Sequence, residues 1–217
     1  MILLILALLM ATVTIFIVFM GFHKRVIIEK KKLPRRFALY HEFVGNYPQV
    51  MSQIYTEFFR DIYGVFHRDT LSFGIYYDNL SRTVDPNQAR GIVGVYVFEQ
   101  DVGAAQAFAS SHAGYHFAVF PEVDALFSRI IHRNALSFLW ARWRIFPAFF
   151  KYLSQYHLVT NIDEEVNGII EDYYWGSSNK YTEFILPFGP HAQAYYRTTA
   201  PAPRQKIKSL RKFAIRI

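Results

Sequence analysis

The chain of 217 residues is long enough for one ordinary domain between its terminal segments and leaves no room for a second core. The absence of cysteine excludes disulfides, thiolate metal sites and cysteine nucleophiles. The formal charge of +7 is concentrated at the ends: residues 23–36 and 204–217 carry +6 each, which leaves −5 for residues 37–203. This distribution argues against binding of nucleic acid and favours contact of the two basic ends with anionic lipid headgroups.

The first predicted element is a membrane anchor. Residues 2–22 contain no charged side chain, and a basic juxtamembrane neck at residues 23–36 follows them. A helix of that length rises about 30 Å, the thickness of the hydrocarbon core of a bilayer. Basic flanks stay on the side of synthesis or of a matrix, so we expect a single-pass protein with an anchor at residues 1–22 that contacts the lipid bilayer. The run lacks the small-residue cleavage site of a secretory signal.

Hydrophobic periodicity divides the body into two successive β-α-β-β units. In the first unit we expect a strand, a helix and two strands at residues 37–43, 47–62, 71–77 and 91–98. In the second we expect two strands, a helix and two strands at residues 115–120, 123–131, 134–156, 168–174 and 181–187. Each unit alone would leave apolar faces in water, so the two must share a core. The predicted fold class is α+β, with a transmembrane helix before a domain of two β-α-β-β repeats.

Several segments of the body carry a resemblance to a known family. FGIYYDN at residues 73–79, GIIEDYY at 168–174 and YTEFILPF at 181–188 resemble the GyrI-like small-molecule-binding fold, which we assign to residues 37–190. The helical stretch 137–158, with Pro147 inside it, is similar to that of the testis-expressed ER-phagy receptor branch of this family, which has a single N-terminal membrane anchor. The resemblance implies a domain that acts by binding and not by catalysis.

The resemblance also implies a site for an amphipathic or cationic small molecule. It places an acidic residue in a strand of the second unit, and Glu171 matches that position. A carboxylate between aromatic walls attracts a cation through its charge and through the ring faces. The candidate walls are Tyr76, Tyr173, Tyr174 and Trp175. The alternative is that Glu171 points outward on an alternating strand while Ile170 or Asp172 faces the core.

The sequence lacks the usual catalytic and cofactor motifs. It has no nucleophile elbow, no phosphate-binding glycine loop and no zincin motif. His112 and His116 have the spacing of metal ligands on a helix, but Gly114 separates them and no third ligand is evident. We therefore expect no metal, no cofactor and no catalytic residue. A small-molecule hydrolase that uses Glu171 as its base is a less favoured alternative.

The basic tail at residues 191–217 ends in an amphipathic pattern. Ile207, Leu210 and Ile217 recur at helical spacing among basic residues, so we expect them to dock on a bilayer or a partner protein. Two functions remain open. One is an adaptor or accessory subunit of a membrane complex, for instance in the mitochondrial inner membrane. The other is an ER-phagy-receptor-like adaptor or small-molecule-binding domain at the endoplasmic reticulum membrane. The long acidic tail of those receptors has no counterpart here, which favours the first.

Overall fold

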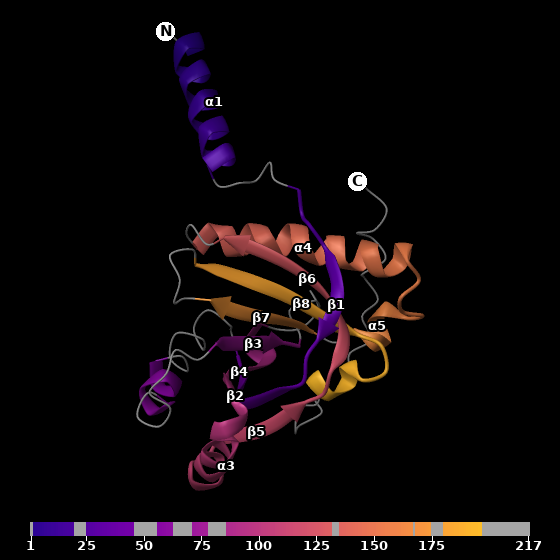
Figure 1. Cartoon of the computed structure of the whole chain (residues 1–217). Coiled ribbons are helices and arrows are strands. Elements are labelled where there is room, and N and C mark those ends of the chain that lie inside the picture. Colours follow the sequence, from indigo (N-terminus) through magenta and orange to yellow (C-terminus); the bar gives the residue numbers. More distant parts are fainter. Residues whose placement is uncertain are drawn as a thin grey trace.

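The computed structural model describes residues 2–19, 25–45, 56–62, 71–77, 86–131, 135–166, 168–174 and 180–196 (Figure 1). The strands are β1 (Glu29–Leu33), β2 (Arg36–Val44), β3 (Ser72–Tyr76), β4 (Arg90–Val97), β5 (Tyr115–Phe120), β6 (Val123–Ile131), β7 (Ile169–Tyr174) and β8 (Tyr181–Phe188). The helices are α1 (Ile2–Phe19), α3 (Val102–Ser111), α4 (Ala135–Gln155) and α5 (Ile162–Glu165), with a further helical stretch at residues 56–62. Three short 3-10 helices are η1 (Pro86–Gln88), η2 (Glu99–Asp101) and η3 (Ala192–Tyr195).

The N-terminal helix overturns the predicted anchor. Within the described ranges, no helix combines the length and the apolar character needed to cross a bilayer. The predicted transmembrane segment at residues 2–22 is therefore wrong, and so is the assignment to the mitochondrial inner or endoplasmic reticulum membrane that depended on it.

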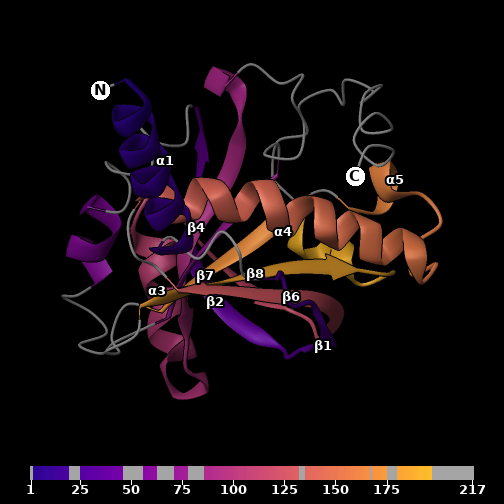
Figure 2. The ribbon, with the colours of Figure 1, turned by 90° about the horizontal axis from the view of Figure 1, so that it is seen from above.

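The predicted architecture of two tandem repeats is also wrong, because the strands form one curled antiparallel sheet. Its order is β1-β6-β8-β7-β3-β4-β2-β5. The two halves of the chain meet where β3 pairs with β7, with Gly74 opposite Glu171. This pairing satisfies the backbone groups of both strands, which would otherwise be sheet edges. The sheet curls strongly and forms a half-barrel with an inner and an outer face (Figures 1 and 2).

A continuous ladder connects the two ends of the curled sheet. β1 runs into β2, and β5 runs into β6, through links of two residues each. Leu33 pairs with Val123 at the end of the β1–β6 ladder, and Arg36 pairs with Phe120 at the start of the β2–β5 ladder. The register therefore passes through both links without a slip. The β1–β2 segment consequently crosses from one half of the sheet to the other and brings Lys31 and Arg36 to the inner face.

Helices cover the outer face. α4 packs over β6, β7 and β8 (Figures 1 and 2), where Ile145 and Phe149 join Phe184 in a buried apolar cluster. α3 and the helical stretch at residues 56–62 pack over the other half, around Phe58 and Phe108. Each helix buries the apolar stripe that its 3.6-residue period produces. The inner face is thus the face that no long helix covers among the described residues.

The inner face has its own aromatic core. Phe73 and Phe120 form its centre, and η3 covers it with the ring of Tyr195, which stacks on Phe120 at a centroid distance of 4.6 Å. The Tyr195 hydroxyl donates a hydrogen bond of 2.8 Å to the carbonyl of Pro121. The buried hydroxyl therefore has a partner, as a buried polar group requires. This core supports the polar residues described next.

Candidate functional site

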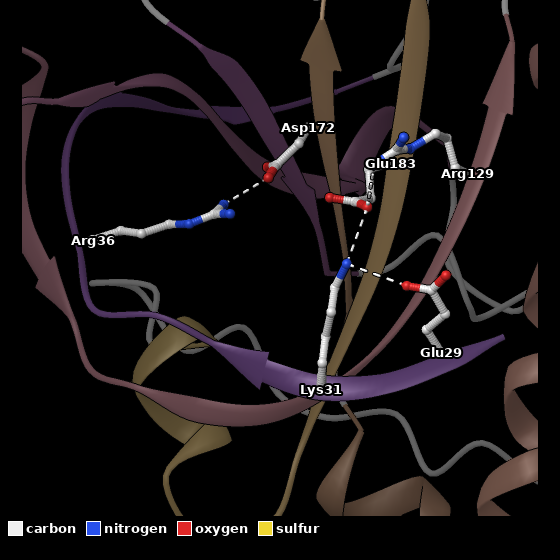
Figure 3. Close-up of polar contacts among 6 residues, drawn as sticks. All are labelled: Glu29, Lys31, Arg36, Arg129, Asp172 and Glu183. Atoms are coloured by element: carbon white, nitrogen blue, oxygen red, sulfur yellow. Dashed lines mark hydrogen bonds and ion pairs between the residues drawn. The ribbon is translucent and has the colours of Figure 1, made fainter.

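Two buried carboxylates lie side by side on the inner face. Asp172 on β7 is the register partner of Glu183 on β8, and both residues are buried. Alternate residues of a strand share a face, and the neighbours Ile170 and Ile185 belong to the inner core. Two adjacent carboxylates repel each other and are costly to bury without cations. Figure 3 shows the cations that surround them.

Asp172 has a closely bound cation. Arg36 Nη1 donates to Asp172 Oδ2 at 2.6 Å (Figure 3), and the Tyr96 hydroxyl donates to Oδ1 at 2.9 Å. The guanidinium of Arg36 also lies 4.4 Å from the centroid of the Tyr96 ring, and 15% of the Arg36 side chain is exposed. Burial raises the pKa of Asp172, and the Arg36 and Tyr96 interactions oppose that rise. Burial lowers the pKa of Arg36, but attraction to Tyr96 and Asp172 outweighs it, so Arg36 stays charged.

Among the described residues, the cations near Glu183 are loosely placed. Arg129 Nη2 lies 3.4 Å and Lys31 Nζ lies 3.6 Å from Glu183 Oε1. The Lys31 and Arg129 side chains are 43% and 55% exposed, whereas the Glu183 side chain is 8% exposed. Lys31 also lies 3.5 Å from Glu29 Oε2, and Figure 3 shows its ammonium between the two carboxylates. Glu183 is therefore a buried acid whose positive partners are long, solvent-exposed side chains.

Aromatic rings flank the Glu183 end of the pair. The rings of Tyr174 and Tyr181 stack at 4.2 Å, and the Arg129 guanidinium lies 4.3 Å from the Tyr181 centroid. Lys31 Nζ lies 4.1 Å from the centroid of Phe127. Ring faces attract cations, most strongly where water is excluded. Burial raises the pKa of Tyr174, and the negative charges of Asp172 and Glu183 raise it further, so its hydroxyl stays neutral.

The predicted site residue Glu171 lies on the other side of β7, under α4. Arg142 Nε donates to Glu171 Oε1 at 3.1 Å, and Arg142 Nη2 forms an ion pair with the same oxygen at 2.9 Å. The Tyr173 hydroxyl donates to Oε2 at 2.9 Å. The Tyr76 hydroxyl lies 2.6 Å from that of Tyr173. Glu171 is fully buried. The structure thus brings together three of the predicted site residues, in a closed cluster whose cation is supplied by the chain itself.

The remaining predicted site residues do not join this cluster. Tyr174 projects to the inner face, next to Tyr181. Trp175 and the tail residues Ile207, Leu210 and Ile217 lie outside the described residues. The ligand-binding role of the Glu171 cluster stays a prediction, as does docking of the tail. Among the described residues, no three His, Asp or Glu side chains gather as metal ligands.

Sequence reasoning missed four residues of the inner face: Asp172, Glu183, Arg36 and Lys31. A signal for the acids was present, because Glu183 interrupts an apolar strand and Asp172 follows Glu171 directly in another. In a strand that is covered on both faces, adjacent acids are both buried, and each needs its own cation. The charge distribution suggested that Arg36 and Lys31 contact lipid headgroups, and it gave no sign that they pair with Asp172 and Glu183.

Comparisons with known proteins identify the fold. The EcmrR chain of a cryo-electron microscopy EcmrR–DNA complex is similar with a TM-score of 0.53 and 12% identity, over 75% of this chain and 57% of the EcmrR chain. An uncharacterized conserved protein from Listeria innocua is similar with a TM-score of 0.52 and 11% identity, over 76% of this chain and 93% of that chain. These likenesses support the GyrI-like fold predicted from the sequence. No protein-family model and no curated protein matches the chain, and nothing supports the resemblance to the ER-phagy receptor branch.

Proposed function

We propose that this protein is a non-enzymatic binding domain that takes a small organic cation on the inner face of its sheet, with Glu183 as the counter-charge. The observation that carries the proposal is a buried carboxylate whose cations sit at 3.4 and 3.6 Å on exposed side chains. Such a carboxylate binds a new cation in preference to these side chains if that cation approaches it more closely and loses less hydration. The GyrI-like fold supports a binding role.

The surroundings of Glu183 favour an aromatic cation with a planar head. An amidinium or guanidinium offers two parallel N–H groups to a carboxylate, and an aromatic body can pack on the rings of Tyr181 and Phe127. Asp172 keeps Arg36 as its partner, so the ligand needs to balance one negative charge. Benzamidine is a suitable probe because it is a cation at neutral pH, and benzamide is its uncharged counterpart of nearly the same shape.

The Glu171 cluster supports a structural role for that residue. A general base must reach the proton that it removes from a substrate. Glu171 is fully buried under α4, and both of its carboxylate oxygens accept hydrogen bonds from the chain. The hydrolase alternative loses its proposed base on these grounds, and we favour binding without catalysis.

Calorimetric titration of the full chain tests the proposal. Benzamidine should bind at least about tenfold more tightly than benzamide, a difference of about 1.4 kcal/mol. Glu183→Gln should weaken benzamidine binding by a similar factor. Glu122→Gln is the matched control, because Glu122 pairs with Lys32 and its side chain is 54% exposed. Equal binding of benzamide, or unchanged binding to Glu183→Gln, would contradict the proposal.

A further inference from the structure

We infer that Lys31 is a displaceable internal counter-ion of Glu183: an incoming organic cation takes the place of its ammonium group, which then pairs with Glu29. The inference rests on the proposed function and names the residue that regulates it. The bound cation and Lys31 would compete for one carboxylate. The affinity of the site is then set partly by a side chain that does not touch the ligand.

The placement of Lys31 lowers the free-energy cost of replacing its ammonium at Glu183. Its Nζ lies 3.6 Å from Glu183 Oε1 and 3.5 Å from Glu29 Oε2, so it keeps a carboxylate partner after it leaves Glu183 (Figure 3). Neither contact has the short distance of a strong charge-assisted hydrogen bond. Because the side chain is partly exposed, its ammonium also keeps part of its hydration in either position.

The other two cations are placed for different roles. Arg36 holds Asp172 at 2.6 Å from a largely buried position, so its displacement would leave a buried charge without a partner. Arg129 packs on the Tyr181 ring, which keeps its guanidinium beside Glu183 when Lys31 leaves. Exchange is therefore confined to Lys31, and one positive charge replaces another.

The next residue of β1, Lys32, is a matched control, because successive side chains of a strand point to opposite faces of the sheet. Lys32 lies on the same edge strand, but its Nζ pairs with Glu122 Oε1 at 2.8 Å and not with Glu183. Lys31→Met and Lys32→Met remove the same charge and keep a side chain of similar length. Any general electrostatic gain for a cationic ligand should therefore be similar in both variants, and a difference between them reports direct competition.

The first test is the affinity of the full-length variants for benzamidine by calorimetry. Lys31→Met should bind about five- to tenfold more tightly than wild type, while Lys32→Met should stay within about twofold. Glu29→Gln should weaken binding a few-fold, because Lys31 then loses the partner that receives it. Equal affinities of the two lysine variants, or weaker binding by Lys31→Met, would overturn the inference.

A second readout follows the lysine itself. Mass spectrometry after brief acetylation should show that saturating benzamidine increases the reactivity of Lys31 and leaves Lys32 unchanged; unchanged Lys31 reactivity would also contradict displacement. The measured affinities distinguish failure of the proposed function from failure of the Lys31 inference. If neither wild type nor Lys31→Met binds benzamidine, the proposed function fails together with the inference. If wild type binds in a Glu183-dependent way and Lys31→Met binds no more tightly, the inference alone is wrong.

Discussion

Replacing Arg142 by Met should destabilise the protein by about 3 kcal/mol, which is the lower end of the range for breaking a buried ion pair. Arg142 supplies both a hydrogen bond and an ion pair to Glu171 Oε1. Methionine fills much of the same space but leaves the buried carboxylate with the Tyr173 hydroxyl as its donor among the contacts described above. We take the lower end because the Arg142 side chain is 27% exposed, so water can partly replace it.

The double variant Arg142→Met/Glu171→Leu separates the pair from its environment. Removing both charges eliminates the desolvation cost of the pair, and apolar side chains can pack against the cluster beneath α4. We therefore expect the double variant to unfold with a free energy within about 1 kcal/mol of wild type. The two substitutions should then be non-additive by several kcal/mol, which is the signature of a direct interaction.

Urea denaturation of the full chain, followed by circular dichroism, measures these differences. Lys151→Met is the control, because Lys151 is an exposed residue of the same helix and should change the free energy of unfolding by no more than about 0.5 kcal/mol. A loss below about 1 kcal/mol in Arg142→Met would refute the reasoning. A double variant as unstable as the single one would show instead that Arg142 acts through packing.

Four further outcomes follow from the described contacts. Burial raises the pKa of Asp172 in the folded state above its value in the unfolded chain. The stability that Asp172 contributes is therefore fully present below about pH 4, where it is neutral in both states, and is lost as the pH rises through its pKa in the folded state. Arg36→Met should raise the pKa of Asp172 further. In urea titrations, the variant should therefore lose more unfolding free energy relative to wild type at pH 7 than at pH 4. The Tyr115 hydroxyl donates to Asp61 at 2.8 Å and lowers its pKa, so Tyr115→Phe should raise the pKa of Asp61 in a carboxyl NMR titration. Burial and Asp61 raise the pKa of Tyr115 to about 12, and Asp61→Asn should lower it in an ultraviolet titration. Gly94→Ala would place a methyl group 2.5 Å from a carbonyl oxygen of β2, and we expect thermal melting to show a loss of at least about 1 kcal/mol.

Periodicity located several strands well, because their pattern is local. The predicted strands at residues 71–77, 168–174 and 181–187 correspond to β3, β7 and β8 within about two residues. Continuous apolar runs bounded by turn residues are typical of strands covered on both faces. Because these runs are apolar throughout, they lack the alternation of apolar and polar residues that would have shown which face Glu171 and Asp172 occupy. Only the tertiary structure shows that these two acids lie on opposite faces of the sheet.

Strand β1 shows what the sequence could not reveal. Its residues, EKKKL, have one apolar position, so neither a helical nor a strand period is visible, and the charge run suggested a neck beside lipid. Its strand conformation comes from pairing with β6, more than ninety residues away. Lysines at a sheet edge are a common protection against edge-to-edge pairing. The role of Lys31 therefore depends on a long-range register that composition alone does not specify.

The contrast between the two faces of the sheet supports a structural role for Glu171 and the proposed cation site at Glu183. On the outer face, one carboxylate meets one arginine under a helix, so the charges balance inside the fold. On the inner face, Arg36 balances Asp172, and Glu183 adds a second buried negative charge. That surplus charge is balanced by side chains that reach in from solvent. Because Lys31 can leave Glu183 and keep Glu29 as a partner, the inner face supports the proposed binding of a foreign cation, whereas Arg142 on the outer face would leave the buried Glu171 without its cation.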